Sequence, residues 1–163
     1  MCSSDLGTVV LGAMGAEAGE GAAPGSAEAA GSRLLRLARV EGDPLRVLAA
    51  PAALLPAGPL ASRAEIGFVD TPPGPDGTRR AVPLVVRIGD ALHPSLSLRA
   101  LMAYWQAGAD DVTVRLGDSV EVRGRLGSAR IPLDEAGLYW VNFRHGVEDL
   151  VSYGYSQALA QLA

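Results

Sequence analysis

The sequence feature that most constrains the fold is a turn followed by a long apolar run, residues 75–88. Asp76-Gly77 predicts a tight turn, because Gly accepts positive φ and Asp can bond its own backbone. The residues after it predict one strand with Thr78, Arg80, Val82, Leu84, Val86 and Ile88 on one face and Arg79, Ala81, Pro83, Val85 and Arg87 on the other. The first face is expected to pack, and the second to meet water or a partner. Pro83 cannot donate to a ladder, which predicts a sheet edge or a bulge there.

The charged residues of this stretch leave two interpretations open. Arg79, Arg80 and Arg87 could form an anion or carboxylate site, since guanidinium forks match planar acids. The interpretation that we favour pairs them with Asp70, Asp76 or Asp90 across the hairpin, each pair contributing less than ~1 kcal/mol where it is exposed. Asp76 and Asp134 both precede glycine-bearing turns and are expected to form those turns rather than to act as catalytic acids.

Composition narrows the possible functions. The 163 residues suit one domain, and 48% hydrophobic with 20% charged residues is typical of a soluble globular protein. All 14 basic residues are arginine, which excludes a Walker A lysine, a Schiff-base lysine and the β3 lysine of a kinase. Because these arginines are scattered among 18 acids, we expect no nucleic-acid partner.

Cysteine and histidine are scarce. The single cysteine, Cys2, excludes a disulfide framework and a cysteine metal cluster. His93 and His145 are the only histidines, whereas a zinc site needs three or four ligands, so we expect no metal and no cofactor. Residues 1–6 resemble a translated sequencing adapter and are expected to be non-native. We see no membrane-spanning segment, because the most apolar stretch, residues 47–60, is short and broken by prolines.

The first half of the chain predicts strands joined by loose connections. We expect a short strand at 7–12, a flexible Gly/Ala-rich loop at 13–31, and a helix or a strand, undecided, at 32–40. The loop lacks the spacing of a phosphate-binding glycine motif. A strand is expected at 45–50, a proline-rich connection at 54–62, and a strand at 65–70 that pairs antiparallel with the stretch after Gly77.

The second half carries sharper signals. Gly89-Asp90 predicts a hairpin, and Pro94-Ser95 begins a helix whose stripe of Leu98, Leu101, Met102 and Trp105 ends at Gly108. Strands are expected at 112–116 and 120–123, then at 129–133 and 138–143 around a turn at 134–137, before a closing helix at 156–162. The fold class is therefore mixed α/β (α+β), a sheet with several hairpins packed by a few helices.

Taken in order, these motifs resemble the CHASE domain of type two, a cyclase- and histidine-kinase-associated sensory domain. The resemblance rests on Ile-Gly-Phe-Val at 66–69, Asp-Gly-Thr-Arg-Arg-Ala-Val-Pro-Leu at 76–84, His-Pro-Ser-Leu-Ser-Leu at 93–98, Ile-Pro-Leu-Asp-Glu-Ala-Gly at 131–137, Asn-Phe-Arg at 142–144 and Ser-Tyr at 152–153. It covers residues 66–162. We expect residues 7–163 to be a single partial domain whose N-terminal βα units are missing.

The resemblance implies a sensory input module outside the bacterial cytoplasmic membrane, on the periplasmic face, non-catalytic itself. In such receptors, membrane segments absent from this chain connect the domain to an adenylate or guanylate cyclase, a histidine kinase or a Ser/Thr kinase. The signal is an unnamed small molecule or an envelope cue, and a homodimer is possible. The candidate ligand-binding residues are Arg79, Arg80, His93, Asn142, Arg144 and Tyr153. The residues that the motifs assign to structure are Asp76, Gly77, Pro83, Pro94, Ser95, Pro132, Asp134, Gly137 and Ser152.

Two rival functions come from other classes. Gly154-Tyr155-Ser156-Gln157-Ala158 resembles a degenerate nucleophile elbow of a serine hydrolase, but no Asp or His follows it, and His145 would need another chain order. Ser156 is explained more simply as a helix N-cap. The second rival is a structural dimerisation module. Five aromatic residues cluster near the end of the chain, namely Tyr139, Trp140, Phe143, Tyr153 and Tyr155. We expect most of them to pack in the core, and an aromatic wall of a ligand site is the alternative.

Overall fold

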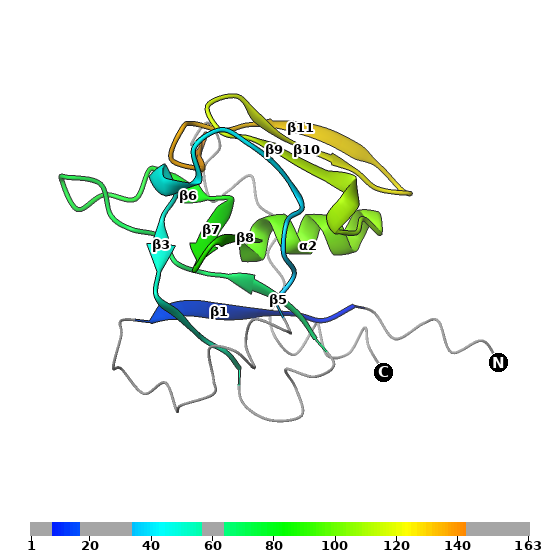
Figure 1. Cartoon of the computed structure of the whole chain (residues 1–163), viewed down its shortest axis with the longest axis horizontal. Coiled ribbons are helices and arrows are strands. Elements are labelled where there is room, and N and C mark those ends of the chain that lie inside the picture. Colours follow the sequence, from blue (N-terminus) through cyan, green and yellow to red (C-terminus); the bar gives the residue numbers. More distant parts are fainter. Residues whose placement is uncertain (1–7, 17–33, 57–63, 143–163) are drawn as a thin grey trace, which may run out of the picture.

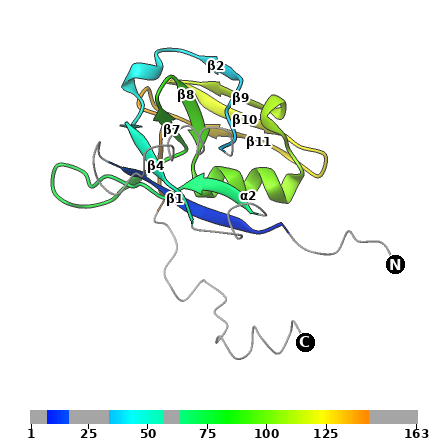
Figure 2. The same cartoon turned by 60° about the horizontal axis from the view of Figure 1, so that its bottom comes forward.

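The computed structural model describes residues 8–16, 34–56 and 64–142. These residues form a mixed α/β fold, as predicted, in which strands of several small sheets surround the helix α2 (Figure 1). One sheet has the order β4-β1-β5, a second β11-β10-β9-β2, a third β3-β7-β8, and β12 pairs with β6. Helix α2 lies between the first two sheets (Figures 1 and 2).

The sheet β4-β1-β5 is built around β1 (Val10–Ala16), which runs parallel to β5 (Glu65–Phe68) and antiparallel to β4 (Ala52–Leu54). The predicted strand at 7–12 therefore continues to Ala16, into the first residues of the expected loop. The prediction that residues 65–70 pair antiparallel with the stretch after Gly77 is wrong. Three of the four β5 residues are buried, and a strand buried on both faces is typical of parallel pairing.

The apolar run after Gly77 forms two strands rather than one. β6 (Ala81–Pro83) pairs antiparallel with β12 (Leu138–Trp140), whereas β7 (Val85–Ile88) pairs antiparallel with β8 (Ala91–Pro94) and parallel with β3 (Ala49–Ala50). The prediction that the face with Pro83 and Val85 meets water is wrong, because residues 83–86 are all buried. Pro83 has no N–H, and the chain changes partners at Leu84, whose N–H donates to the Gly137 carbonyl at 2.9 Å.

Four further strands, β2, β9, β10 and β11, form the remaining sheet, and a turn of 3-10 helix precedes β3. The hairpin at Gly89-Asp90 is confirmed, and so is the pairing of β9 (Val112–Arg115) with β10 (Ser119–Arg123) around Gly117, which has φ +84°. β11 (Ser128–Pro132) pairs with β10, and β12 with β6, so the predicted hairpin of residues 129–133 with 138–143 is wrong. The sequence leaves the segment at 32–40 open between helix and strand, and its last residues begin a strand, β2 (Arg39–Glu41). η1 (Pro44–Arg46) replaces the front of the strand expected at 45–50.

Helix α2 (Leu96–Trp105) is the predicted helix. The Ser95 hydroxyl accepts from the Leu98 N–H at 3.3 Å, and Gln106 ends the helix in the left-handed conformation, two residues before Gly108. η3 (Ala109–Asp111) follows. Leu98 and Met102 are fully buried, whereas Leu101 and Trp105 are half-buried.

Two apolar clusters hold the layers together. The larger one joins α2 to the valines of β9 and β10, namely Val112, Val114, Val120 and Val122. The smaller one contains Ala13, Leu34, Ala53, Ile66, Phe68 and Val86, and so connects β1 and β5 to β7. β1 and β7, which belong to this smaller cluster, also contribute residues to the lining of the cleft described next.

Candidate functional site

A cleft of about 510 Å³ opens where the carboxyl ends of β1, β5 and β3 meet. Its lining residues are Met14, Gly15, Leu48, Ala49, Ala50, Pro51, Val69, Asp70, Thr71, Pro72, Arg79 and Val86. Small-molecule sites occupy roughly 300–1,000 Å³, and in α/β sheets they lie beyond the carboxyl ends of parallel strands. The cleft has both the size and the position expected of a ligand site.

Small residues bring the walls of the cleft together. A Cβ built on Gly15 would lie 2.6 Å from the Ala50 Cβ, so β1 and β3 approach at a distance that only glycine allows. Val86, which is 1% exposed, supplies part of the apolar lining. The lining therefore combines small and aliphatic side chains with the polar groups of Asp70, Thr71 and Arg79.

Asp70 brings a carboxylate to the cleft. β5 has ended at Phe68, and the Asp70 Oδ2 atom accepts the N–H of Gly15 at 2.9 Å in place of a further ladder bond. Its neighbour Thr71 bends the chain, with its hydroxyl donating to the Val69 carbonyl at 3.4 Å. The carboxylate is half-buried and held by the backbone of β1.

Arg79 is the cationic residue of the cleft lining. Its Nε donates to the Thr71 carbonyl at 2.8 Å, which ties the start of the 79–83 segment to the loop after β5. A guanidinium carries five N–H donors. Within the described part of the chain, no ion pair joins Arg79 to Asp70. The sequence predicted Arg79 as a contact residue, and the structure places it at the cleft.

The neighbouring arginines have other partners. Arg80 pairs with Asp76 at 2.7 Å, and Arg87 donates from Nη1 to the Gly89 carbonyl at 2.9 Å. The pKa of Asp76 is lowered, most strongly by its contact with Arg80 and less by the hydrogen bond that its carboxylate accepts from the Thr78 N–H. Arg80 does not line the cleft. The favoured ion-pair interpretation therefore describes Arg80, whereas Arg79 is bonded to a backbone carbonyl.

His93 is a core residue. It is 3% exposed, its Nδ1 lies 2.9 Å from the Leu35 carbonyl, and its ring is tilted against Phe68 with the centroids 6.0 Å apart. Because the partner is a carbonyl, Nδ1 carries the proton. Burial lowers the pKa of His93, with nearby Arg36 acting in the same direction and the Leu35 carbonyl against it. The structure thus separates His93, a predicted contact residue, from the cleft.

The remaining predicted residues fall into three groups. Asn142 is exposed at the end of the described chain, and Arg144, Ser152 and Tyr153 lie outside the described residues, as do His145 and Ser156. Asp134 shapes its turn by accepting the N–H groups of Ala136 and Leu138, both at 2.9 Å. Glycines at positive φ (Gly77, Gly137), the buried Pro94 and Ser95, and the exposed Pro132 at the end of β11 complete the structural set.

Sequence reasoning missed most of the cleft. The sequence marks Asp70 only as an ion-pair partner, presents Gly15 only in a glycine loop that lacks phosphate-binding spacing, and marks neither Ala50 nor Thr71 as a site residue. An acid directly after a buried strand was the one available signal, since strand ends of a parallel pair share an edge. The other lining residues carry no chemical signal of their own.

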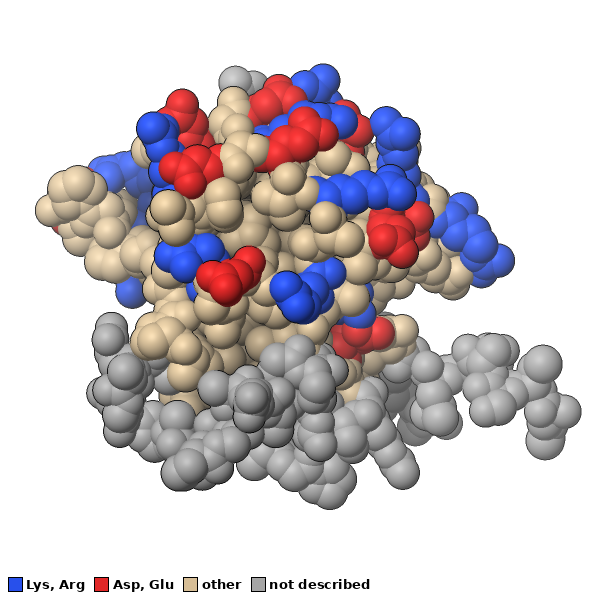
Figure 3. Space-filling view, in the orientation of Figure 1, with Lys and Arg blue, Asp and Glu red and all other residues tan. Residues whose placement is uncertain are grey.

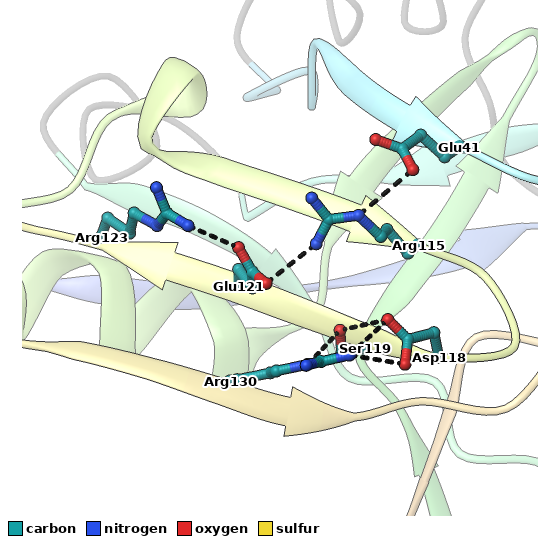
Figure 4. Close-up of polar contacts among 7 residues, drawn as sticks. All are labelled: Glu41, Arg115, Asp118, Ser119, Glu121, Arg123 and Arg130. Carbon is teal, nitrogen blue, oxygen red and sulfur yellow. Dashed lines mark hydrogen bonds and ion pairs between the residues drawn. The ribbon is translucent and has the colours of Figure 1, made fainter.

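A second polar surface covers the outer face of the sheet β11-β10-β9-β2 (Figures 3 and 4). Arg115 bonds Glu41 at 3.2 Å and Glu121 at 2.9 Å, and Glu121 also pairs with Arg123 at 3.0 Å. Burial alone would raise the pKa of Glu121, but the two arginines hold it below its usual value. Beside them, Arg130 pairs with Asp118 at 2.7 Å and donates to the Ser119 hydroxyl at 3.0 Å.

These charges satisfy one another, which is typical of a solvated sheet face rather than a catalytic site. In the part of the chain that the structure describes, no group of three or more His, Cys, Asp or Glu side chains could hold a metal ion. No helix among the described elements is long and apolar enough to cross a membrane. The cleft is thus the candidate site.

Comparison with known proteins gives one match. The family model described as CHASE2 domain matches residues 9–162. No curated protein and no solved structure matches the chain.

Proposed function

The chain belongs to the CHASE2 domain family, extracellular sensory domains of signalling receptors, and we propose that it is the periplasmic input module of a bacterial transmembrane receptor. In this proposal the domain binds a small molecule and performs no chemistry of its own. Its output domain is a cyclase, a histidine kinase or a Ser/Thr kinase.

The observation that carries the proposal is the cleft at the ends of β1, β5 and β3. Its described side chains with polar groups are Asp70, Thr71 and Arg79, each bonded to the backbone. Nucleophilic catalysis needs a nucleophile within hydrogen-bond reach of a base that a third group orients. A carboxylate and a guanidinium fixed by backbone contacts are suited to binding and orientation.

The cleft is also connected to β12, the last strand among the described residues. Arg79 lies two residues before β6, which pairs with β12, and the Val141 N–H donates to the Arg80 carbonyl at 2.9 Å. A ligand that pulls on Arg79 would therefore displace β6 and, with it, the strand from which the chain continues towards its C-terminus. Such a displacement is the event that a receptor needs to transmit.

Topology mapping of the full-length protein tests this proposal. Alkaline phosphatase, active only outside the cytoplasm, is fused within the exposed turn at Gly77, and a cytoplasm-active reporter at the same site serves as the control. We expect phosphatase activity and no signal from the control. Activity of the cytoplasmic reporter alone would refute an extracytoplasmic input domain.

A further inference from the structure

We propose that the cleft recognises the zwitterionic head of a free α-amino acid with an aliphatic side chain. The inference rests on the proposed sensory function and names the ligand class of the same site. It is carried by two opposite charges that line one cleft and are held by separate backbone anchors, Asp70 by Gly15 and Arg79 by Thr71.

Arg79 is suited to the carboxylate of the ligand. Its Nε is engaged by the Thr71 carbonyl, which orients the guanidinium. Among the described residues the two Nη atoms have no ion-pair partner, and we assign them to the ligand. A planar guanidinium binds a carboxylate through parallel N–H···O bonds, which fix orientation as well as strength. The neighbouring Arg80, already paired with Asp76, is not equivalent.

Asp70 is suited to the ammonium group. The Gly15 N–H occupies Oδ2. Oδ1 lies 3.5 Å from the position that a Cβ on Gly15 would take, so the missing side chain leaves Oδ1 open on that side. An ammonium donates three hydrogen bonds and is strongest with a charged acceptor. Because Asp70 and Arg79 form no ion pair with each other within the described structure, a ligand carrying both charges can satisfy both.

Charge and lining together select the ligand class. A simple anion would be attracted by Arg79 but repelled by Asp70, and a simple cation would be attracted by Asp70 but repelled by Arg79. A zwitterion, which satisfies both charges, is therefore favoured over either ion. Beyond the charged pair the lining offers aliphatic side chains, namely Leu48 before β3, Ala50 in β3 and Val86 in β7. A side chain such as that of leucine fits this surface, and a charged one leaves its own charge unpaired.

The test is isothermal titration calorimetry of the full 163-residue chain with three probes. L-leucine carries both charges, leucine amide lacks the carboxylate, and 4-methylpentanoate lacks the ammonium group. We expect L-leucine to bind, and each analogue to bind about tenfold or more weakly, as expected for losing one charge-assisted contact.

The variants are Arg79→Gln and Asp70→Asn, with Arg80→Gln as the matched control. Each of the first two is expected to weaken L-leucine binding by about tenfold or more, and the control by less than about twofold. Arg79→Gln should change the affinity for leucine amide little, since that ligand has no carboxylate to lose. Asp70→Asn keeps an amide oxygen for the Gly15 N–H, and circular dichroism confirms that each variant is folded.

Three outcomes would overturn the inference: no measurable heat with L-leucine, equal binding of 4-methylpentanoate and L-leucine, or an equal effect of Arg79→Gln and Arg80→Gln. The topology experiment depends only on the location of the domain. A failure of the amino-acid assignment is therefore distinguishable from a failure of the sensory function.

Discussion

Replacing Gly67 with alanine tests how β5 and α2 are assembled. A Cβ built on Gly67 would lie 2.5 Å from the Leu96 Cα and 2.7 Å from both the Leu96 nitrogen and the Ser95 carbonyl oxygen. These are backbone atoms at the start of α2, so no side-chain rotation can relieve the overlap. Phe68 and Ser95 also form a parallel bridge, which holds the two segments together at this point. The added methyl group must push β5 away from the helix.

The expected cost follows from the type of contact. Overpacking of a dense core costs about 1–3 kcal/mol, and backbone neighbours favour the upper end. Removing a glycine from the unfolded chain returns about 0.4–1 kcal/mol. We therefore expect the free energy of unfolding to fall by about 2 kcal/mol. For a domain of this size each kcal/mol lowers Tm by about 2–4 °C, so Tm should fall by roughly 4–8 °C.

Urea denaturation followed by circular dichroism measures this change, with Gly108→Ala as the matched control. The nearest atom to a Cβ on Gly108 is the Asp111 Oδ2 at 3.6 Å, an ordinary contact, so the control should shift stability by less than about 0.5 kcal/mol. Equal stability of the two variants would refute the close approach of α2 to β5.

Three further predictions concern charged and titratable groups. Glu65→Gln should lower the free energy of unfolding by about 1–3 kcal/mol in urea titrations, because it leaves the buried Arg99 without its charged partner. Arg99→Met should cost less, because it removes the buried charge itself. A larger cost for Arg99→Met would contradict this reasoning. The melting temperature should fall as the pH drops below about 6.5. Burial lowers the pKa of His93 in the folded protein, so the unfolded chain takes up the proton first and is favoured. His93→Asn should flatten this pH dependence. Glu121→Gln should lower the stability of the protein at low salt, because it removes the ion pairs with Arg115 and Arg123. The loss should shrink at about 1 M salt, where the Debye length is ~3 Å. A loss that does not depend on salt would argue against these ion pairs.

The elements with local signals could be predicted from the sequence. The turn at Gly89-Asp90 and the turn at Gly117 need only a glycine that accepts positive φ, and the helix after Ser95 needs only a cap and an apolar stripe. Each signal lies within a few residues of the structure that it specifies. These predictions are confirmed for that reason.

Strand pairing could not be predicted, because a strand sequence does not specify its partner. β1 and β5 are about 50 residues apart in the chain, and only the burial of three of the four β5 residues indicates a parallel pair. The continuous apolar run at 82–86 was consistent with one long strand, and the change of partners at Leu84 depends on Gly137, far along the chain. Non-local contacts of this kind are decided by the whole fold.

The candidate site likewise has one part with a local sequence signal and one part that depends on contacts between distant residues. Arg79 could be chosen from its place in a turn-strand motif, whereas the cleft exists only because β1, β3 and β5 end together. Asp70 acquires its role from the Gly15 N–H, a contact across 55 residues. Residue chemistry alone therefore finds one of the two charges and gives no reason to connect them.

The break at Pro83 is the feature that connects the cleft to the rest of the domain. On one side of it, β6 carries the Arg79 segment to β12; on the other, β7 contributes Val86 to the cleft lining. Between them, Leu84 donates its N–H to Gly137 and accepts the N–H of Ser95, the residue that caps α2. An uninterrupted strand would give residues 79–88 a single partner on each side. The segment is instead a junction, because one short stretch of chain contacts the cleft, β12 and the residue that caps α2.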